Sequence, residues 1–227
     1  MEEYQQLVGI ISLGLGAAWA SGINLYAALV MIGLLGVTGN MTLPEELEIL
    51  TNPLVIGAAG LMYMVEFVAD KMPGVDTGWD SLHTFIRIPA GAMLAAGAVG
   101  DVTPAVELAA AIVGGGVAAT SHMAKAGSRV MINTSPEPFS NWVASITEDL
   151  LVFGGLWAAI SNPWLFLGLF IAFILIAIWF IPKLWRGIKG VFRWLGGLFV
   201  STAPENPVTA TATDRPATLP SPTDSGP

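Results

Sequence analysis

The sequence contains no cysteine, and charged residues are scarce in it. Only 11% of its 227 residues are charged, whereas a soluble domain typically carries about 25%. Without cysteine, the protein has no disulfide bond, thiolate metal site or cysteine nucleophile. The net charge of −8 at pH 7 argues against nucleic acid as a partner, because nucleic-acid binding requires a basic surface.

Lysine and arginine are also absent from the first 70 residues, which are rich in apolar side chains. Over the whole chain 54% of residues are hydrophobic, and a helix that crosses a bilayer needs about 20 mostly apolar residues. Three apolar stretches begin with a capping residue followed by proline, at Asn52, Thr103 and Asn162. We predict an all-α integral membrane protein, a bundle of about six transmembrane helices over residues 7–37, 53–72, 80–99, 104–129, 140–160 and 163–181.

The basic residues predict which end of the bundle faces the cytoplasm. The gaps between apolar stretches alternate between basic and base-free, as the positive-inside rule requires of a multi-pass protein. The basic gaps contain Lys71, Lys125 and Arg129, whereas the gap around Glu45 has no base. An even number of spans therefore places both termini on the basic, cytoplasmic side.

A basic amphipathic segment follows the last apolar stretch. Lys183, Arg186, Lys189 and Arg193 share one face of a helix predicted over residues 183–200. Such a helix lies on a membrane surface, so we predict that these four bases contact anionic lipid headgroups. The transmembrane domain is thus expected to cover residues 1–182, and the Pro- and Thr-rich tail over residues 201–227 to be disordered.

Polar side chains interrupt the second to fifth apolar stretches at helical spacing, in the half of each stretch nearest the basic end. A charge at the membrane centre costs about 2.5 to 3.5 kcal/mol, and short acidic side chains cannot reach water from that depth. The polar residues are therefore expected to face one another and form an ion or solute site. Its candidate members are Glu66, Asp70, Asp80, His83, Arg87, His122, Lys125, Arg129, Ser145, Glu148 and Asp149, with Asn24 and Tyr26 as candidate cavity-lining residues near a kink or break in the first helix.

Three functions are compatible with this pattern. The first is a small transporter or channel component open to the cytoplasm, in which Arg87, Lys125 and Arg129 attract an anionic group while the acids relay protons. The second is a membrane scaffold whose buried charges only pair helices. The third is divalent-cation handling by acids and histidines. The sequence has no nucleotide loop, zinc-protease spacing or nucleophile elbow, so we expect no enzymatic activity, cofactor or resident metal; an oligomer is compatible with the sequence.

Several short motifs resemble a known family. They are the segments from Ser21 to Tyr26, from Glu66 to Asp76, from Gly115 to Arg129 and from Ser145 to Asp149. Together they resemble the bacterial multi-pass membrane family called domain of unknown function 4126, and the resemblance extends from Leu7 to Trp185. It implies a protein of the bacterial inner (plasma) membrane. It implies no activity, substrate or catalytic residue.

Overall fold

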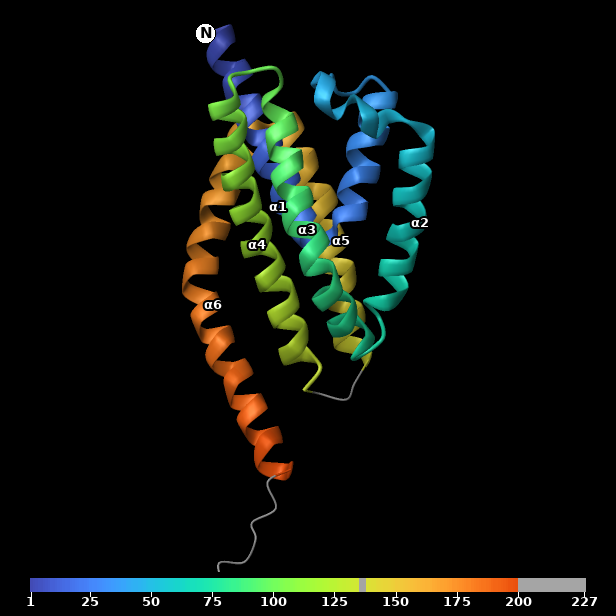
Figure 1. Ribbon diagram of the computed structural model, residues 1–227, viewed down its shortest axis with the longest axis vertical. Helices are drawn as coiled ribbons and strands as arrows, with labels where there is room; N and C mark the ends of the chain where they lie inside the picture. The colour runs from blue at the N-terminus through green and yellow to red at the C-terminus, as the bar shows by residue number, and fades with distance from the viewer. Residues whose placement is uncertain (135–137, 200–227) are drawn as a thin grey trace, which may run out of the picture.

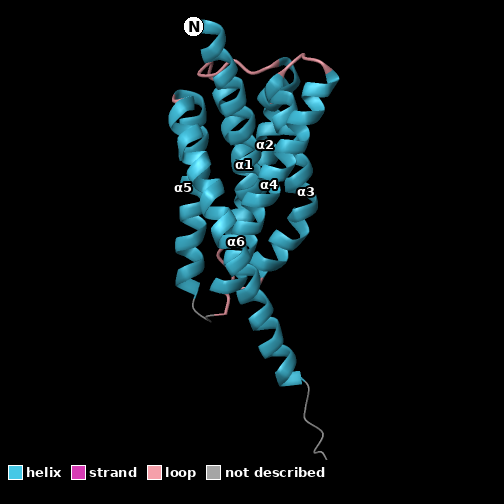
Figure 2. Ribbon diagram, turned by 90° about the vertical axis from the view of Figure 1, so that its left-hand side faces the viewer, coloured by secondary structure: helices cyan, strands magenta, loops and turns pink. Residues whose placement is uncertain are grey.

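The computed structural model describes residues 1–134 and 138–199, and the regular elements in those ranges are all helices. The long helices lie side by side in one bundle, and α6 extends beyond the others at one end (Figures 1 and 2). The all-α class predicted from the sequence is confirmed. The elements are α1 (Glu2–Val37), the short 3₁₀ helix η1 (Glu45–Thr51), α2 (Pro53–Ala69), α3 (Val75–Val99), α4 (Pro104–Ile132), α5 (Pro138–Ser161) and α6 (Pro163–Phe199).

The helices have the length and surface of membrane-spanning segments. Five of them, α1, α3, α4, α5 and α6, are long and apolar enough to cross a membrane, and α2 joined to η1 across a 67° bend makes a sixth candidate. Large apolar side chains such as Leu61, Phe85 and Leu169 are exposed on the outside of the bundle. Because water does not favour such a surface, a surrounding lipid bilayer explains it.

The predicted helix starts have different local causes. The Asn52 side chain accepts a hydrogen bond from the Leu54 backbone N–H at 2.9 Å, and Asn162 does the same for Leu165 at 3.2 Å. Both asparagines therefore cap their helices as predicted. Thr103 precedes α4 without a side-chain capping bond, so Pro104, whose ring already holds a helical φ, marks this start alone.

The first helix folds back on itself at Asn24, whose φ of −146° and ψ of 94° are not helical. The arm before this residue descends along α3, since Gly14 packs against Ala95 and Ala98. The arm after it returns along α2, since Gly33 packs against Ile56. Figure 1 shows both blue arms reaching the same end of the bundle. Helix α1 is therefore a re-entrant pair of arms that meet at Asn24.

This fold-back corrects the predicted path of the chain. The first apolar stretch was expected to cross once, but it enters and leaves at one end, and the full crossings among the described residues are α2 to α6. The N-terminus and the end of α6 at Phe199 therefore lie at opposite ends of the bundle (Figure 1). The prediction that both termini lie on the basic side counted α1 as a span; it stays a prediction, because residues 200–227 lie outside the described residues.

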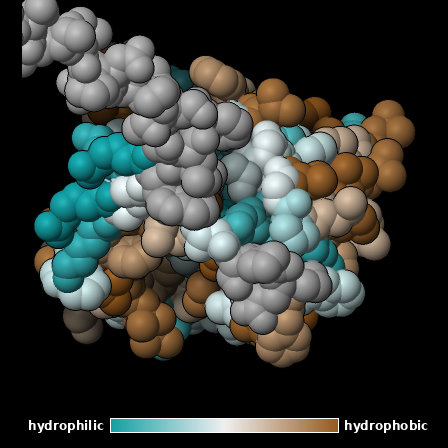
Figure 3. Space-filling view, turned by 90° about the horizontal axis from the view of Figure 1, so that it is seen from below, coloured by the Kyte–Doolittle hydropathy of each residue, from teal (hydrophilic) through white to brown (hydrophobic). Residues whose placement is uncertain are grey.

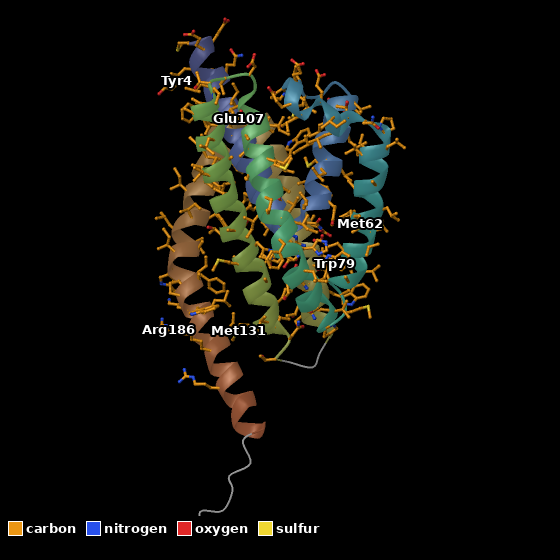
Figure 4. The ribbon with its side chains drawn as sticks, viewed as in Figure 1. Tyr4, Met62, Trp79, Glu107, Met131 and Arg186 are labelled. Atoms are coloured by element: carbon orange, nitrogen blue, oxygen red, sulfur yellow. The ribbon has the colours of Figure 1, made fainter. Side chains whose placement is uncertain are left out.

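Charges are divided between the two ends of the bundle. Figure 4 shows Tyr4 and Glu107 at the end near the N-terminus and Arg186 at the opposite end. We call these the acidic end and the basic end. Seen from the basic end, hydrophilic residues gather on the face and hydrophobic ones lie around much of the rim (Figure 3). The labelled base Arg186 therefore lies at the end that the sequence predicts to be basic.

Helix α6 is continuous through Pro182 and past the other helices. The segment predicted to be an interfacial helix is the last part of α6, and Lys183 places its ammonium 2.9 Å from the centroid of the Trp179 ring. This cation–π contact offsets part of the cost of placing the lysine charge beside the apolar surface of α6. Residue 200 and the tail predicted over residues 201–227 lie outside the described residues.

Candidate functional site

Ionisable side chains from α2, α3, α4 and α5 meet in the interior of the bundle. Arg87 lies in the middle of α3, about 18 Å from either end at 1.5 Å per residue, and its side chain has no exposed surface. Residues far apart in the sequence are brought together by the antiparallel packing of these helices (Figure 1). We call the group the charged cluster, made of Glu66, Asp70, Lys71, Asp76, Asp80, Arg87, Lys125, Arg129, Glu148 and Asp149.

Arg87 joins α2 to α3. Its Nη2 donates to the Glu66 carboxylate at 2.6 Å, and its Nη1 donates to Asp80 at 3.0 Å. All three side chains are at most 1% exposed. Charge-assisted hydrogen bonds of this length are about twice as strong as neutral ones, so Arg87 holds two acids from different helices.

Lys125 lies at the centre of the cluster. Its ammonium donates to Asp70 at 2.9 Å and to Glu66 at 3.2 Å. Two further carboxylates, Glu148 at 3.5 Å and Asp80 at 3.6 Å, lie within ion-pair distance. One base therefore faces four acids from α2, the turn after it, α3 and α5.

Arg129 forms hydrogen bonds at the basic end of the cluster. Its Nε and Nη2 donate to the two oxygens of Glu148 at 3.1 and 2.6 Å, a bidentate pair. Its Nη1 donates to the backbone carbonyls of Asp70 at 2.9 Å and Asn141 at 3.2 Å. The guanidinium thus ties α4 to α5 and to the turn after α2.

His122 is a neutral member of the site. Arg87 can only donate, so its Nη1, at 3.3 Å from Nδ1, assigns that nitrogen as an acceptor. The other nitrogen, Nε2, then carries the hydrogen and donates to Thr84 Oγ1 at 2.7 Å. The histidine therefore extends the hydrogen-bond network without adding charge.

His83 lies beside the cluster and contacts Trp79 and the predicted Tyr26. Its Nδ1 donates to the Trp79 carbonyl at 2.9 Å, and its ring stacks on the Trp79 ring at 4.3 Å. Its Nε2 lies 3.1 Å from the Tyr26 hydroxyl, within hydrogen-bond distance. The structure thus brings His83 and Tyr26 together, outside the ion pairs.

Asp149 differs from the other acids of the site. Its oxygens accept hydrogen bonds from the Asn24 amide at 3.0 Å and the Tyr63 hydroxyl at 3.1 Å. Asn24 is the residue at which α1 breaks. The structure thus places Asn24 in a contact between the tip of α1 and a carboxylate of α5, and its predicted cavity-lining role stays a prediction.

Lys71, in the turn after α2, packs beside α5. Its ammonium donates to the Phe67 carbonyl at 3.0 Å and to the Ser145 hydroxyl at 3.2 Å, and it lies over the Phe67 ring. Burial lowers the pKa of Lys71, while the negative charges of Asp149 and Asp70 act in the opposite direction. Ser145 therefore serves as a partner of this lysine.

Sequence reasoning missed the polar contacts that close the basic end. Asn133 donates to the Asp76 carboxylate at 2.7 Å and accepts from the Asn141 amide at 2.7 Å. Asp76 also accepts from the backbone N–H groups of Thr77 at 2.6 Å and Gly74 at 2.9 Å, in the first turn of α3. An acid is favoured in the first turn of a helix, so Asp76 could have moved the predicted start of this helix to residue 75.

The cluster contains more acids than bases. Six carboxylates accompany four bases, so the fully ionised group has two negative charges in excess. Four buried carboxylate oxygens have no hydrogen-bond partner among the described residues, one each on Glu66, Asp70, Asp76 and Asp80. Buried polar atoms are normally satisfied, so these oxygens have unused capacity for a proton, a cation or water.

The centre of the cluster is shielded by protein, since the side chains of Glu66, Arg87 and Lys125 are at most 1% exposed, whereas that of Glu148 is 14% exposed. Four cavities among the described residues are lined by residues outside the cluster. The cavity of about 450 Å³ between α1, α5 and α6, for example, is lined by apolar side chains such as Trp19 and Phe173. Within residues 1–134 and 138–199, no three acids or histidines have a geometry that would hold a metal ion.

Comparison with known proteins identifies a family. The family model described as "Domain of unknown function (DUF4126)" matches residues 11–183, which cover the re-entrant helix, the crossings and the charged cluster. No curated protein and no solved structure matches the chain. The match covers more than half of the sequence and agrees with the family that the sequence motifs resemble. The chain belongs to the family described as domain of unknown function 4126.

Proposed function

We propose that the protein is a small membrane transporter or channel component whose ion site is the charged cluster, seen here in an enclosed state. The observation that carries this proposal is the excess of buried acids over bases, together with their unpartnered oxygens. Stability alone does not favour such a group, because well-packed apolar residues often stabilise a protein as well as buried ion pairs do. A site that binds and releases a positive charge accounts for the excess.

The re-entrant α1 supports the same proposal. Transporters often bind ions where a helix is broken near the middle of the membrane, because the free backbone groups of the break face the ion. Here the break at Asn24 contacts Asp149 near the middle of α5. A helix break at this depth leaves backbone N–H and C=O groups unpaired, which costs free energy unless neighbouring groups form hydrogen bonds with them.

The sign of the ion follows from the pairing. The sequence suggested that Arg87, Lys125 and Arg129 attract an anion, but each of them is already paired with at least two acids. Four carboxylate oxygens lack a hydrogen-bond partner among the described residues, against one nitrogen of the bases, Arg87 Nε, so most of the unused capacity lies on the carboxylates. We therefore propose a proton or a small monovalent cation, and not an anion, as the ion of the site.

The orientation proposed here follows from the positive-inside rule. The basic end, with Lys71 and the end of α6, faces the cytoplasm of a bacterial inner membrane, and Lys183, Arg186 and Lys189 contact anionic lipid there. The N-terminus, with Glu2 and Glu3, then lies on the outer side, since it is at the opposite end of the bundle.

A scaffold without transport is the second candidate, and one specific observation favours it. Nine ion pairs connect the acids and bases of the described residues, and the side chains in them are between 0% and 14% exposed. In a scaffold the pairs would only hold α2 to α5 together.

Flux measurements on the purified protein in liposomes test the two candidates. We expect proton or monovalent-cation flux that is lost in Lys125→Met and kept in the control Glu107→Gln, an exposed acid at the other end. Exchanging the bidentate partners, in Arg129→Glu with Glu148→Arg, should preserve the fold and abolish flux. A well-folded protein with no flux of protons, cations or anions would refute transport and favour the scaffold.

A further inference from the structure

Asp149 is the one buried acid of the cluster with no basic partner. The other five carboxylates each have a lysine or arginine nitrogen within 4.0 Å among the described residues, whereas Asp149 has none. Asp149 is only 9% exposed. An ionised carboxylate at such a position lacks the charge partner that normally offsets the loss of water.

The partners of Asp149 suit a group that gains and loses a proton. The ionised form accepts from Asn24 Nδ2 at Oδ1 and from Tyr63 Oη at Oδ2. An amide nitrogen cannot accept a hydrogen bond, but a phenol oxygen can. When Oδ2 binds a proton from water, it donates that proton to Tyr63 Oη, and the phenol turns its own hydrogen away. Both states of Asp149 are therefore hydrogen-bonded with little movement.

The protonation state of Asp149 acts directly on the break in α1. Asn24 Oδ1 accepts from the Ala27 backbone N–H at 3.0 Å and so begins the second arm. The same side chain donates to Asp149. A hydrogen bond to a carboxylate is about twice as strong as one to a neutral acid. Protonation of Asp149 therefore weakens the hydrogen bond that joins α5 to the tip of α1.

The polar groups around Asp149 come from α1, α2, the turn after α2, α4 and α5. From α1 the neighbour is the uncharged Asn24. The titratable neighbours are Tyr63 and Glu66 on α2, Asp70 and Lys71 in the turn after it, Lys125 and Arg129 on α4, and Glu148 on α5 itself. The bases among them are engaged by other partners. A proton on Asp149 thus removes one of the two excess negative charges.

We propose that Asp149 is the proton-binding site of the protein and that proton binding there controls the tip of the re-entrant α1. The ligand is a proton taken from water, held between Asp149 Oδ2 and Tyr63 Oη. One part of this inference, that the proton is the ion carried by the cluster, rests on the proposed function. Proton binding itself can be measured without any transport.

Infrared difference spectroscopy on the whole protein in lipid tests the proposal. The pH is lowered from about 9 to about 5.5, a range in which exposed carboxyl groups stay ionised. We expect the wild type to gain the C=O band of one protonated carboxyl group, and Asp149→Asn to lose that band. Tyr63→Phe should shift the band without removing it, because only the partner of the acid changes. Glu107→Gln serves as a control that leaves the band intact.

Two results would overturn the inference: a wild type without the band, and a band that remains in a folded Asp149→Asn. If Asp149→Asn does not fold, the shift in Tyr63→Phe decides, and an unshifted band refutes the site. Flux in liposomes separates this inference from the proposed function. A band assigned to Asp149 in a protein with no flux keeps the proton site and refutes transport. Flux that persists without the band keeps transport and refutes the site.

Discussion

Replacing Arg87 with methionine tests whether the charged cluster is as tightly coupled as its geometry indicates. The substitution removes hydrogen bonds of 2.6 Å to Glu66 and 3.0 Å to Asp80 from a guanidinium without exposed surface. Breaking a buried pair by removing one partner typically costs about 3 to 5 kcal/mol, because the other charge stays buried. Lys125 still lies 3.2 Å from Glu66 and 3.6 Å from Asp80. The loss should therefore fall at the lower limit, about 3 kcal/mol in the free energy of unfolding.

The coupling between Arg87 and Glu66 can be measured by a double-mutant cycle. Glu66→Gln added to Arg87→Met removes one of the stranded negative charges, so we expect the double mutant to recover about 1 to 2 kcal/mol relative to the sum of the single mutants. Unfolding by sodium dodecyl sulfate in mixed micelles, followed by helical circular dichroism, gives the free energies. The exposed Arg186→Met serves as the control, with a change within about 0.5 kcal/mol.

Tight coupling in the cluster is refuted if Arg87→Met changes the free energy of unfolding by no more than Arg186→Met does. It is also refuted if the two single changes are additive, because side chains in direct contact should couple. Either outcome would mean that the charges are hydrated and that the enclosed cluster does not describe the protein in a membrane.

Three further predictions follow from the path of the chain and from the cluster. Gly22→Ala should destabilise the protein by about 1 to 3 kcal/mol in the same unfolding assay, because the added carbon would overlap the Ala118 carbonyl and Ser121 Oγ, whereas Gly116→Ala, with open space around it, should not. Since the chain has no cysteine, cysteines introduced one at a time at Glu3 and Lys189 should react with an impermeant thiol reagent from opposite sides of the membrane, and labelling from the same side would contradict the re-entrant α1. Asn24→Ala should lower the free energy of unfolding by about 1 kcal/mol, the usual cost of losing a helix cap, and an unchanged value would show that the α1 break does not depend on its capping bond.

Much of the bundle could be predicted because helix formation depends on nearby residues. The second to fifth apolar stretches correspond to helices within about five residues, whereas α6 continues to Phe199, and the proline that follows Asn52, Thr103 or Asn162 marks the first residue of its helix. The polar stripes lie in the interior as expected, since a charge facing lipid is costly in any arrangement of the helices. The gathering of the bases at one end is likewise visible in their order along the chain.

The pairing of acids with bases could not be predicted. Helical periodicity places a side chain on one face of its helix but does not say which other helix that face contacts. Glu148 pairs with Arg129 and not with Arg87, and Asp149, its neighbour in the sequence, points to Asn24 and Tyr63. These pairings depend on the rotation and depth of each helix in the bundle.

The sequence by itself determined a helical membrane protein with buried charges, because hydrophobicity and the cost of charge in lipid act residue by residue. Only the tertiary structure decided that α1 turns back at Asn24, since a continuous apolar stretch can form one long helix or two arms with nearly the same local energy. The choice rests on distant contacts, with Gly14 against α3, Gly33 against α2 and the Asn24 amide on Asp149. The same contacts leave one carboxylate without a base, and from it we infer the proton site.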